Sequence, residues 1–248
     1  MSAAAPQPPL TPAADVHAVL ARDGHAVVDA PSLAALCGVH LADLLAWRPR
    51  WDDLPDDRYL RDGGHYRQRR HSCFVIDGDA VTQAPHRPHW QSVDYNALHG
   101  GIERHFEAMP AAWTADPAWH RLLRGLAGCA TRLRGEQAWY VEAHPFRITT
   151  AGGIGRPTPE GAHRDGVEFV AVILVSRADI KGGETRVFEA TGPHGLRFTL
   201  DEPFSALLLD DARVIHESTP IQPLDPSREG HRDTLVLTYR AGGFQGAR

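Results

Sequence analysis

The sequence predicts an α+β protein that is mainly β, with helices in its first half and antiparallel strands in its second. Before residue 137, apolar residues recur at helical spacing between loop-like segments. After it, β-branched and aromatic segments follow about every ten to fifteen residues, separated by glycine and proline and without helical stretches between them. We therefore expect one domain over residues 1–248, with a helical and mixed part at 1–136 and a β core at 137–241.

The first half is expected to hold helices at both of its ends. Thr11 and Pro12 are typical of a helix start, and Gly24 is typical of a helix end. Asp116 and Pro117 begin a second amphipathic helix that runs to about residue 133. The remaining expected elements are a strand at 26–28, a helix at 33–45, a loop at 50–68, a strand at 67–76 and an irregular segment at 86–90.

The second half is expected to form strands only. Segments this short and this regularly spaced favour an antiparallel barrel or sandwich. We interpret the pattern as a double-stranded β-helix of the jelly-roll or cupin-like type, with the N-terminal helices packed on it. The expected strands are 138–149, 166–176, 185–189, 195–200, 204–210, 213–221 and 234–240.

Composition limits the classes of function and location. The formal net charge of −5 provides no general basic surface for nucleic acid or an anionic membrane. Three scattered cysteines (Cys37, Cys73 and Cys129) do not form a disulfide framework or a thiolate zinc motif. Residues 1–9 lack the layout of a signal peptide, and the longest apolar run, 169–175, is too short to span a bilayer. We expect a cytoplasmic protein without nucleic-acid or membrane partners, possible homodimerisation being left open.

One of three His-x-acid pairs stands out as a metal-binding candidate. With 15 histidines and 31 acidic residues, chance alone gives about two such pairs, so the spacing by itself carries little weight. The pairs at 105/107 and 231/233 lie in a charged stretch and near the C-terminus, respectively. His163 and Asp165 instead open a strongly apolar strand, and side chains two apart on a strand point to the same face. The middle pair is therefore the candidate.

A third ligand candidate is His216, which lies 53 residues after His163. Two imidazoles and one carboxylate on one side of an ion, with open positions opposite, are typical of mononuclear iron(II) sites. We therefore predict that His163, Asp165 and His216 bind a metal. The competing interpretations are ordinary core or surface histidines with an aspartate that caps a turn, and a zinc hydrolase that uses the same three residues.

The last strand offers an anion-binding pair. Alternation places Arg232, Thr234, Val236 and Thr238 on one face. A guanidinium and a hydroxyl two positions apart suit a dicarboxylate ligand. The alternative is an ion pair of Arg232 with Asp165 or Asp211, because a buried guanidinium needs an anionic partner.

Candidate substrate residues are less well defined. Strand 139–148 places Tyr140, Glu142, His144 and Phe146 on one face, which is unusually polar for a core. Arg147 has the opposite parity, so it can join that face only if Pro145 marks a bulge. A role for Glu184, next to a tight glycine turn, is a further possibility. The candidates are Tyr140, Glu142, Arg147, Glu160 and Arg164.

The motifs together resemble a known family. The runs 159–166, 181–185, 211–220 and 231–235 look like those of iron(II)/2-oxoglutarate dioxygenases, in particular the bacterial L-isoleucine 4-hydroxylase-like branch that acts on free amino acids. The match covers about residues 137–240. It implies iron(II) at His163, Asp165 and His216, and 2-oxoglutarate at Arg232 and Thr234. One departure is Pro145, where the family leads us to expect an amide side chain.

The resemblance implies an amino acid hydroxylase. Such an enzyme uses iron(II), the co-substrate 2-oxoglutarate and O2, hydroxylates an unactivated C–H bond of a free L-amino acid or similar small substrate, and releases succinate and CO2. One alternative is the same chemistry on a peptide or carrier-bound substrate, and another is a protein or nucleic-acid demethylase. A non-catalytic β-barrel sensor of metal or dicarboxylate also stays open, since a fold does not fix a function.

Overall fold

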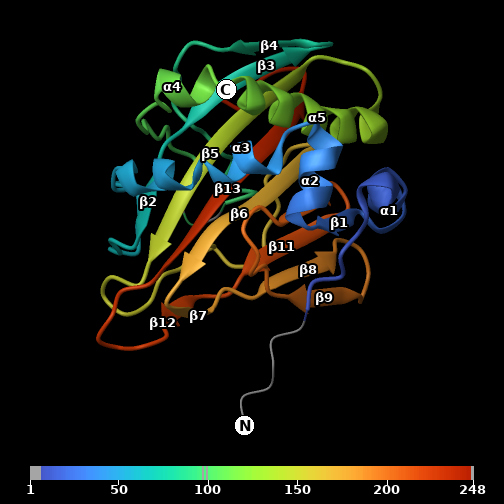
Figure 1. Ribbon diagram of the computed structural model, residues 1–248. Coiled ribbons are helices and arrows are strands. Elements are labelled where there is room, and N and C mark those ends of the chain that lie inside the picture. The colour runs from blue at the N-terminus through green and yellow to red at the C-terminus, as the bar shows by residue number, and fades with distance from the viewer. Residues whose placement is uncertain (1–6, 97, 99, 247–248) are drawn as a thin grey trace.

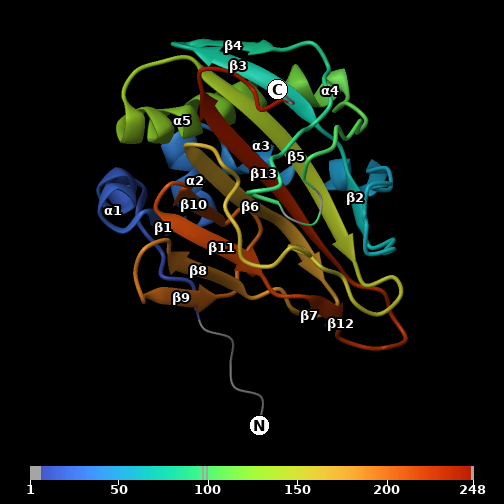
Figure 2. The same cartoon turned by 180° about the vertical axis from the view of Figure 1, so that it is seen from behind.

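Figure 1 and Figure 2 show a computed structural model of the chain, which describes residues 7–96, 98 and 100–246. A large antiparallel sheet forms the centre. Helices cover one of its faces, and a small sheet lies against the other (Figures 1 and 2). The prediction of a mainly β chain with N-terminal helices is confirmed, and the antiparallel sheets are consistent with a jelly roll.

Helices α1, α2, α3 and α5 lie in the ranges that the sequence signals predict, whereas η2 begins the segment predicted to be a loop and α4 was not predicted. Asp116 caps α5 by accepting a hydrogen bond from the backbone N–H of Ala118. The helix predicted at 33–45 is two helices, because Gly38 has a left-handed backbone (φ 62°) that ends the first one. The helical elements are η1 (Ala13–Asp15), α1 (Val16–Asp23), α2 (Ala30–Cys37), α3 (Leu41–Leu45), η2 (Arg48–Asp53), α4 (Ala111–Thr114) and α5 (Pro117–Arg134).

The large sheet places β13 between β5 and β6. Its order is β1-β10-β6-β13-β5-β3-β4, and β2 also pairs with β5. All of these pairings are antiparallel. The strands are β1 (His25–Val28), β2 (Arg67–Arg69), β3 (Ser72–Asp77), β4 (Ala80–Gln83), β5 (Trp139–Thr149), β6 (Phe169–Ala178), β10 (Ala206–Asp210) and β13 (His231–Ala241).

The remaining strands form two small sheets opposite the large one. One has the order β11-β8-β9, and β12 pairs with β7 in the other. An antiparallel bridge between His163 and His216 joins the segment before β6 to this side of the molecule. The strands are β7 (Ile180–Gly182), β8 (Thr185–Glu189), β9 (Gly195–Phe198), β11 (Val214–Ser218) and β12 (Ile221–Pro223).

Two apolar cores stabilise this arrangement. The larger one joins the helices to one face of the large sheet and includes Leu123, Leu126, Ile173 and Leu237. The smaller one, around Leu174, Phe198 and Leu207, lies between the sheets. It fills one end of the space between them, so that polar side chains can line the other end.

The helices were also compared with the requirements of a membrane span. In the described ranges no single helix is long and apolar enough to cross a bilayer. The bent helix pair Ala30–Cys37 and Leu41–Asp53 meets the requirements of a membrane span in its length and composition only.

Candidate functional site

A polar pocket lies over the middle of the large sheet, on the face away from the helices. Its floor comes from β5 and β13, whose alternate side chains point into it, as the alternation predicts. The segment 157–165 and His216 close the other side. The floor residues are Tyr140, Glu142, His144, Phe146 and Ile148 of β5, and Arg232, Thr234, Val236, Thr238 and Arg240 of β13.

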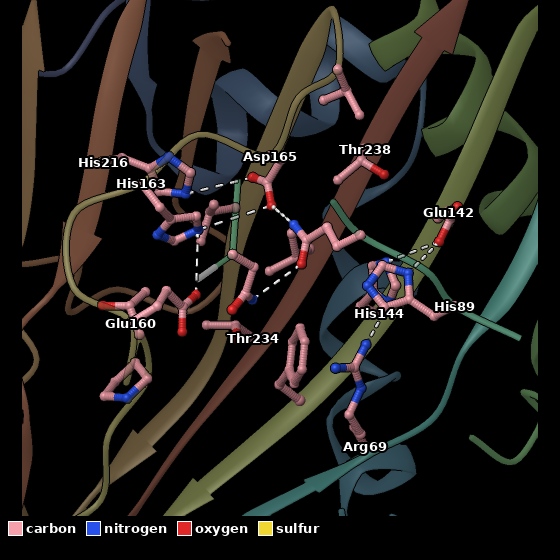
Figure 3. Close-up of a pocket in the computed structure, with 18 of the residues that line it drawn as sticks. Arg69, His89, Glu142, His144, Glu160, His163, Asp165, His216, Thr234 and Thr238 are labelled. Carbon is pink, nitrogen blue, oxygen red and sulfur yellow. Dashed lines mark hydrogen bonds and ion pairs between the residues drawn. The ribbon is translucent and has the colours of Figure 1, made fainter. Parts of the chain in front are cut away.

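The structure brings His163, Asp165 and His216 together at one side of this pocket (Figure 3). The Nε2 atoms of His163 and His216 lie 3.9 and 3.8 Å from the two carboxylate oxygens of Asp165. The backbones of the two histidines exchange N–H···O hydrogen bonds of 3.0 Å, so their imidazole rings lie side by side with centroids 4.6 Å apart. One donor atom from each residue falls within a group spanning 4.8 Å, which is compact enough for one metal ion.

Neighbouring groups fix the orientation of these side chains. The carboxylate of Asp211 accepts hydrogen bonds from the backbone N–H groups of Asp165, Gly166 and Val167 at 2.8–3.1 Å, which holds the loop before β6. The Nδ1 of His163 lies 3.0 Å from the carbonyl oxygen of Gly161. Because a carbonyl can only accept, Nδ1 carries a proton, and in the neutral ring Nε2 therefore has its lone pair directed away from this hydrogen bond and available to a metal.

The electrostatics of this group favour a bound cation. Burial, together with Asp211 and Glu160, raises the pKa of Asp165 to about 7. Burial also holds the pKa of His216 well below its ordinary value, which keeps that imidazole neutral and able to coordinate. A divalent cation would stabilise the ionised carboxylate and accept both imidazole lone pairs. The donor set therefore fits a metal such as iron(II).

Arg232 is a buried cation without an anionic partner in the described part of the chain. Its side chain lines the pocket and the residue is only 3% exposed. Among residues 7–96, 98 and 100–246, Nε and Nη2 of Arg232 have no hydrogen-bond partner, and no carboxylate lies within ion-pair distance. The alternative ion pair with Asp165 or Asp211 is thus not formed. Burial and the nearby Arg177 lower the pKa of Arg232 to about 10, so this guanidinium stays charged and requires an anion.

A second cluster of ionisable groups lies at the other side of the pocket (Figure 3). Glu142 Oε2 lies 2.9 Å from His71 Nε2, 2.6 Å from His89 Nδ1 and 3.7 Å from His144 Nε2. All four residues are buried. The sequence prediction included Glu142 but missed the two histidines outside β5, because His71 follows a break between strands and His89 lies in an irregular segment.

The proton positions in this cluster argue against a metal bound by all four residues. Arg69 Nη2 lies 2.7 Å from His144 Nδ1. An arginine can only donate, so His144 Nδ1 accepts and the neutral ring carries its proton on Nε2, which then cannot coordinate a metal. His71 and His89 each offer an N–H to Glu142. The cluster is therefore a carboxylate solvated by imidazole N–H groups and positioned beside a guanidinium.

This cluster predicts that acid destabilises the protein. Burial, partly offset by Glu142, lowers the pKa of His89 to about 3. The unfolded chain takes up this proton near pH 6.5, whereas the folded protein does not. Stability should therefore fall with decreasing pH from about 6.5 towards 3, by about 1.4 kcal/mol per pH unit for this histidine.

Urea unfolding between about pH 6.5 and pH 5 measures this slope. H89Q keeps an N–H donor for Glu142 but does not titrate, so its slope should be smaller than that of the wild type. The matched control is H105Q, at a histidine whose side chain is 65% exposed. An unchanged slope in H89Q would contradict the assignment of a neutral, buried His89.

Three of the five substrate candidates line the pocket and two do not. Tyr140, Glu142 and Glu160 face it. Arg147 points to the other face of β5, which pairs with β13 without a register shift, so Pro145 makes no bulge. Arg164 donates to the carbonyl oxygen of Asp211 and also lies outside the pocket lining. These two predictions are corrected: strand parity turns Arg147 to the other face of β5, and the hydrogen bond to Asp211 holds Arg164 outside the pocket lining.

Glu184, the weaker candidate, forms an ion pair with Arg186 at 2.9 Å. It does not belong to the pocket lining. Position 145, where the family resemblance leads us to expect an amide, has the same parity as Arg147. Its side chain therefore lies on the face of β5 away from the pocket.

Arg147 has a structural partner instead. Its Nε and Nη2 each lie 2.8 Å from an oxygen of Asp233, whose side chain is only 1% exposed. In R147M this carboxylate stays buried without its cation, which should cost about 3–5 kcal/mol of unfolding free energy. The double variant R147M/D233N should recover part of this loss. Urea unfolding tests both, and a change in substrate KM without loss of stability would instead favour a role in substrate binding.

Comparison with known proteins identifies the family. The model of the family described as "2OG-Fe dioxygenase" matches residues 48–238. This range includes both clusters and Arg232. The chain belongs to the 2OG-Fe dioxygenase family. Members use iron(II), 2-oxoglutarate and O2, so these are the cofactors and co-substrates of this oxidoreductase. A comparison with curated proteins gives no match.

Several solved structures are similar to this chain. A bsmA homolog from Methylobium petroleophilum PM1 is 51% identical, with a TM-score of 0.91 over 96% of this chain and 97% of that one. IDO from Bacillus thuringiensis is 18% identical, with a TM-score of 0.75 over 93% and 100% of the two chains. The Fe(II)/(alpha)ketoglutarate-dependent dioxygenase TqaL is 19% identical, with a TM-score of 0.70 over 95% and 91%. At these identities, the last two show likeness of fold alone.

Proposed function

We propose that the protein is an iron(II)/2-oxoglutarate-dependent dioxygenase that hydroxylates an unactivated C–H bond of a free L-amino acid or similar small substrate. The scaffold would be a double-stranded β-helix. The observation that carries the proposal is that His163, Asp165 and His216 share a pocket with Arg232, which has no anionic partner among the described residues. One group offers a metal-binding face, and the other offers a buried cation for a dicarboxylate.

His163, Asp165 and His216 are the better choice for iron of the two clusters. Their donor atoms are separated by 3.8–3.9 Å around the carboxylate, and His163 presents a free Nε2 lone pair. In the other cluster, Glu142 already accepts two short hydrogen bonds, and a guanidinium lies next to His144. A dication there would have to displace those protons against the positive charge of Arg69.

Arg232 and Thr234 are proposed to hold the distal carboxylate of 2-oxoglutarate. Both side chains come from the same face of β13 and line the pocket. The guanidinium can form two parallel N–H···O bonds, and the hydroxyl can add a third donor. The carboxylate would supply the anionic partner that Arg232 lacks in the described chain.

When bound, iron(II) with 2-oxoglutarate supplies the oxidising chemistry, with release of succinate and CO2. The chain binds and orients the reactants and excludes water. Val167, Val172 and Val236 provide apolar surface in the pocket, which limits solvent around the reacting C–H bond.

A small polar substrate suits the rest of the cavity. Its lining contains charges of both signs on mostly buried side chains, including Glu142, Arg69 and Arg104. A zwitterionic amino acid presents both an anion and a cation to such a lining. A peptide or carrier-bound substrate is the second candidate within the same chemistry, and a non-catalytic sensor of metal or dicarboxylate is the third.

Anaerobic reconstitution with iron(II) and 2-oxoglutarate tests the proposal. A weak visible charge-transfer band, followed by succinate formation when oxygen and one of a panel of L-amino acids are added, is the expected result. A band with turnover that no amino acid stimulates would move the search to peptides or carrier-bound acids. Binding without any turnover would favour the sensor, and absence of the band would contradict the cofactor site.

A further inference from the structure

The pocket extends well beyond the proposed 2-oxoglutarate anchor. Arg232 and Thr238 both face it from β13, and Thr238 pairs with Glu142 on β5. Six residues of extended strand span about 20 Å, which is much longer than a five-carbon dicarboxylate. The floor around Glu142 and Thr238 is therefore available to a second molecule (Figure 3).

Among the residues that the structure describes, two buried guanidinium groups without an ion-pair partner lie beside this part of the floor: Arg69 contacts His144, and Arg104 forms a backbone bridge with His89. Arg69 and Arg104 are only 3% and 2% exposed, and both line the pocket. Arg69 lies between the rings of Phe106 and Phe146, with its central carbon 3.8 and 4.2 Å from their centroids.

The hydrogen bonds of these arginines go to neutral groups. Arg69 donates to His144, and Arg104 donates to the side-chain oxygen of Gln91. In the part of the chain that the structure describes, neither arginine forms an ion pair, and the Nε of each is buried without a partner. Two cations removed from water in this way require an anion.

An anionic group lies beside them. Glu142 is 6% exposed, and its hydrogen bonds with His71 and His89 all go to Oε2. Over the described ranges, Oε1 has no hydrogen-bond partner, while the residue lines the pocket. His144 connects the two charges, since its ring lies 2.7 Å from Arg69 and 3.7 Å from Glu142. Opposite charges therefore meet at one end of the cavity.

We propose that this end is a head-group subsite for a free α-amino acid, in which Arg69 and Arg104 bind the carboxylate and Glu142 Oε1 accepts the ammonium. The inference rests on the proposed function and adds its substrate contacts. An α-amino acid carries its carboxylate and its ammonium on one carbon. This short separation matches that of Arg69 and Glu142, which both lie close to the ring of His144. In a peptide or a carrier-bound acid, no single carbon carries both charges.

The subsite also fixes which part of the substrate is oxidised. Glu142, His89 and Arg69 lie on the side of the pocket opposite His163, Asp165 and His216 (Figure 3). A molecule held by its head group at the first side directs its side chain across Val236 towards the second. Hydroxylation is thus expected on the side chain rather than at the α-carbon.

Binding measurements on the wild-type protein provide the first test. With iron(II) and 2-oxoglutarate bound and oxygen absent, calorimetry gives dissociation constants for a panel of the L-amino acids of proteins. For L-leucine the matched probes are isocaproate, which lacks the ammonium, and isoamylamine, which lacks the carboxylate. The corresponding analogues serve for whichever amino acid binds most tightly. Each analogue should bind about 10- to 150-fold more weakly, the usual effect of losing one charged hydrogen bond.

Variants then assign each charge to its residue. In E142Q, the ratio of the dissociation constants of the analogue without ammonium and the amino acid should fall about tenfold or more. In R104M, the corresponding ratio for the analogue without carboxylate should fall by a similar factor. The matched controls are E189Q and R197M, at exposed residues, which should retain both preferences. Circular dichroism checks that every variant is folded, and the wild-type series remains decisive where one is not.

The outcomes separate this inference from the proposed function. Wild-type protein that forms succinate but binds the analogues as tightly as the amino acid overturns the head-group subsite alone. Absence of amino acid binding to the iron and 2-oxoglutarate complex does the same. A second metal ion per chain that is lost in E142Q would also overturn it, because Glu142 would then be a metal ligand. Failure of the wild type to bind 2-oxoglutarate at all would instead remove the proposed function.

Discussion

Replacement of His216 by alanine is expected to abolish succinate formation and to weaken iron(II) binding by more than about 100-fold. Removing a group that only orients a metal ligand costs about 10- to 100-fold, so removal of a ligand itself should cost more. Metal titration of the apoprotein under anaerobic conditions measures the affinity, and a succinate assay measures turnover.

The matched control is H194A, at an exposed histidine in the turn between β8 and β9. It should bind iron(II) and turn over like the wild type. His216 Nδ1 has no hydrogen-bond partner among the described residues, so H216A breaks no side-chain hydrogen bond of that atom and should stay folded. An H216A protein that kept its iron would contradict the metal assignment and direct attention to the Glu142 cluster.

Replacement of Arg232 by methionine should separate stability from co-substrate binding. The loss of the anion partner is expected to weaken 2-oxoglutarate binding by about 2–5 kcal/mol, which corresponds to roughly 30-fold to several-thousand-fold. The ligand-free protein should become equally or more stable, because a buried, unpaired charge is replaced by an apolar side chain of similar size. Few substitutions of a buried arginine are expected to leave the free energy of unfolding unchanged or to raise it.

Thermal unfolding with and without 2-oxoglutarate reports both effects, since a ligand that binds only the folded state raises its stability. R232K keeps the charge but loses the planar fork, so it should bind with intermediate affinity. R177M is the matched control, at the residue opposite Arg232 in the β6–β13 ladder. Comparable losses in R177M and R232M would indicate a general positive field rather than a direct contact. Destabilisation of ligand-free R232M would indicate an internal partner.

Much of the site could be predicted from strand periodicity. Arg232, Thr234, Val236 and Thr238 line the pocket because β13 alternates along its regular pairing with β5, and the register shift between Asp233 and Thr234 affects only its pairing with β6. The same rule, applied to β5, placed Glu142 inside and would have excluded Arg147. Local signals also predicted α5, since its cap Asp116 and its first residue Pro117 are adjacent in the sequence.

The remainder depends on contacts that no local pattern encodes. His89 and Gln91 reach the pocket from a segment without helix or strand, where periodicity has no meaning. Arg104 lies in a similar stretch and pairs with His89 through an isolated bridge. The surroundings of Arg69 depend on Phe106 and Phe146, which lie far apart in sequence and stack on its guanidinium.

Gln91 has a particular consequence for how the two sides of the pocket behave together. Its carboxamide accepts from Arg104 at 3.3 Å and donates to Asp165 at 3.2 Å, so one planar group is shared by both sides. A ligand that draws Arg104 away alters the donor that Asp165 receives. By thermodynamic reciprocity, any factor by which amino acid binding changes metal affinity is the factor by which the metal changes amino acid affinity. Gln91 thus gives the metal side and the amino acid side of the pocket one common hydrogen-bonding partner.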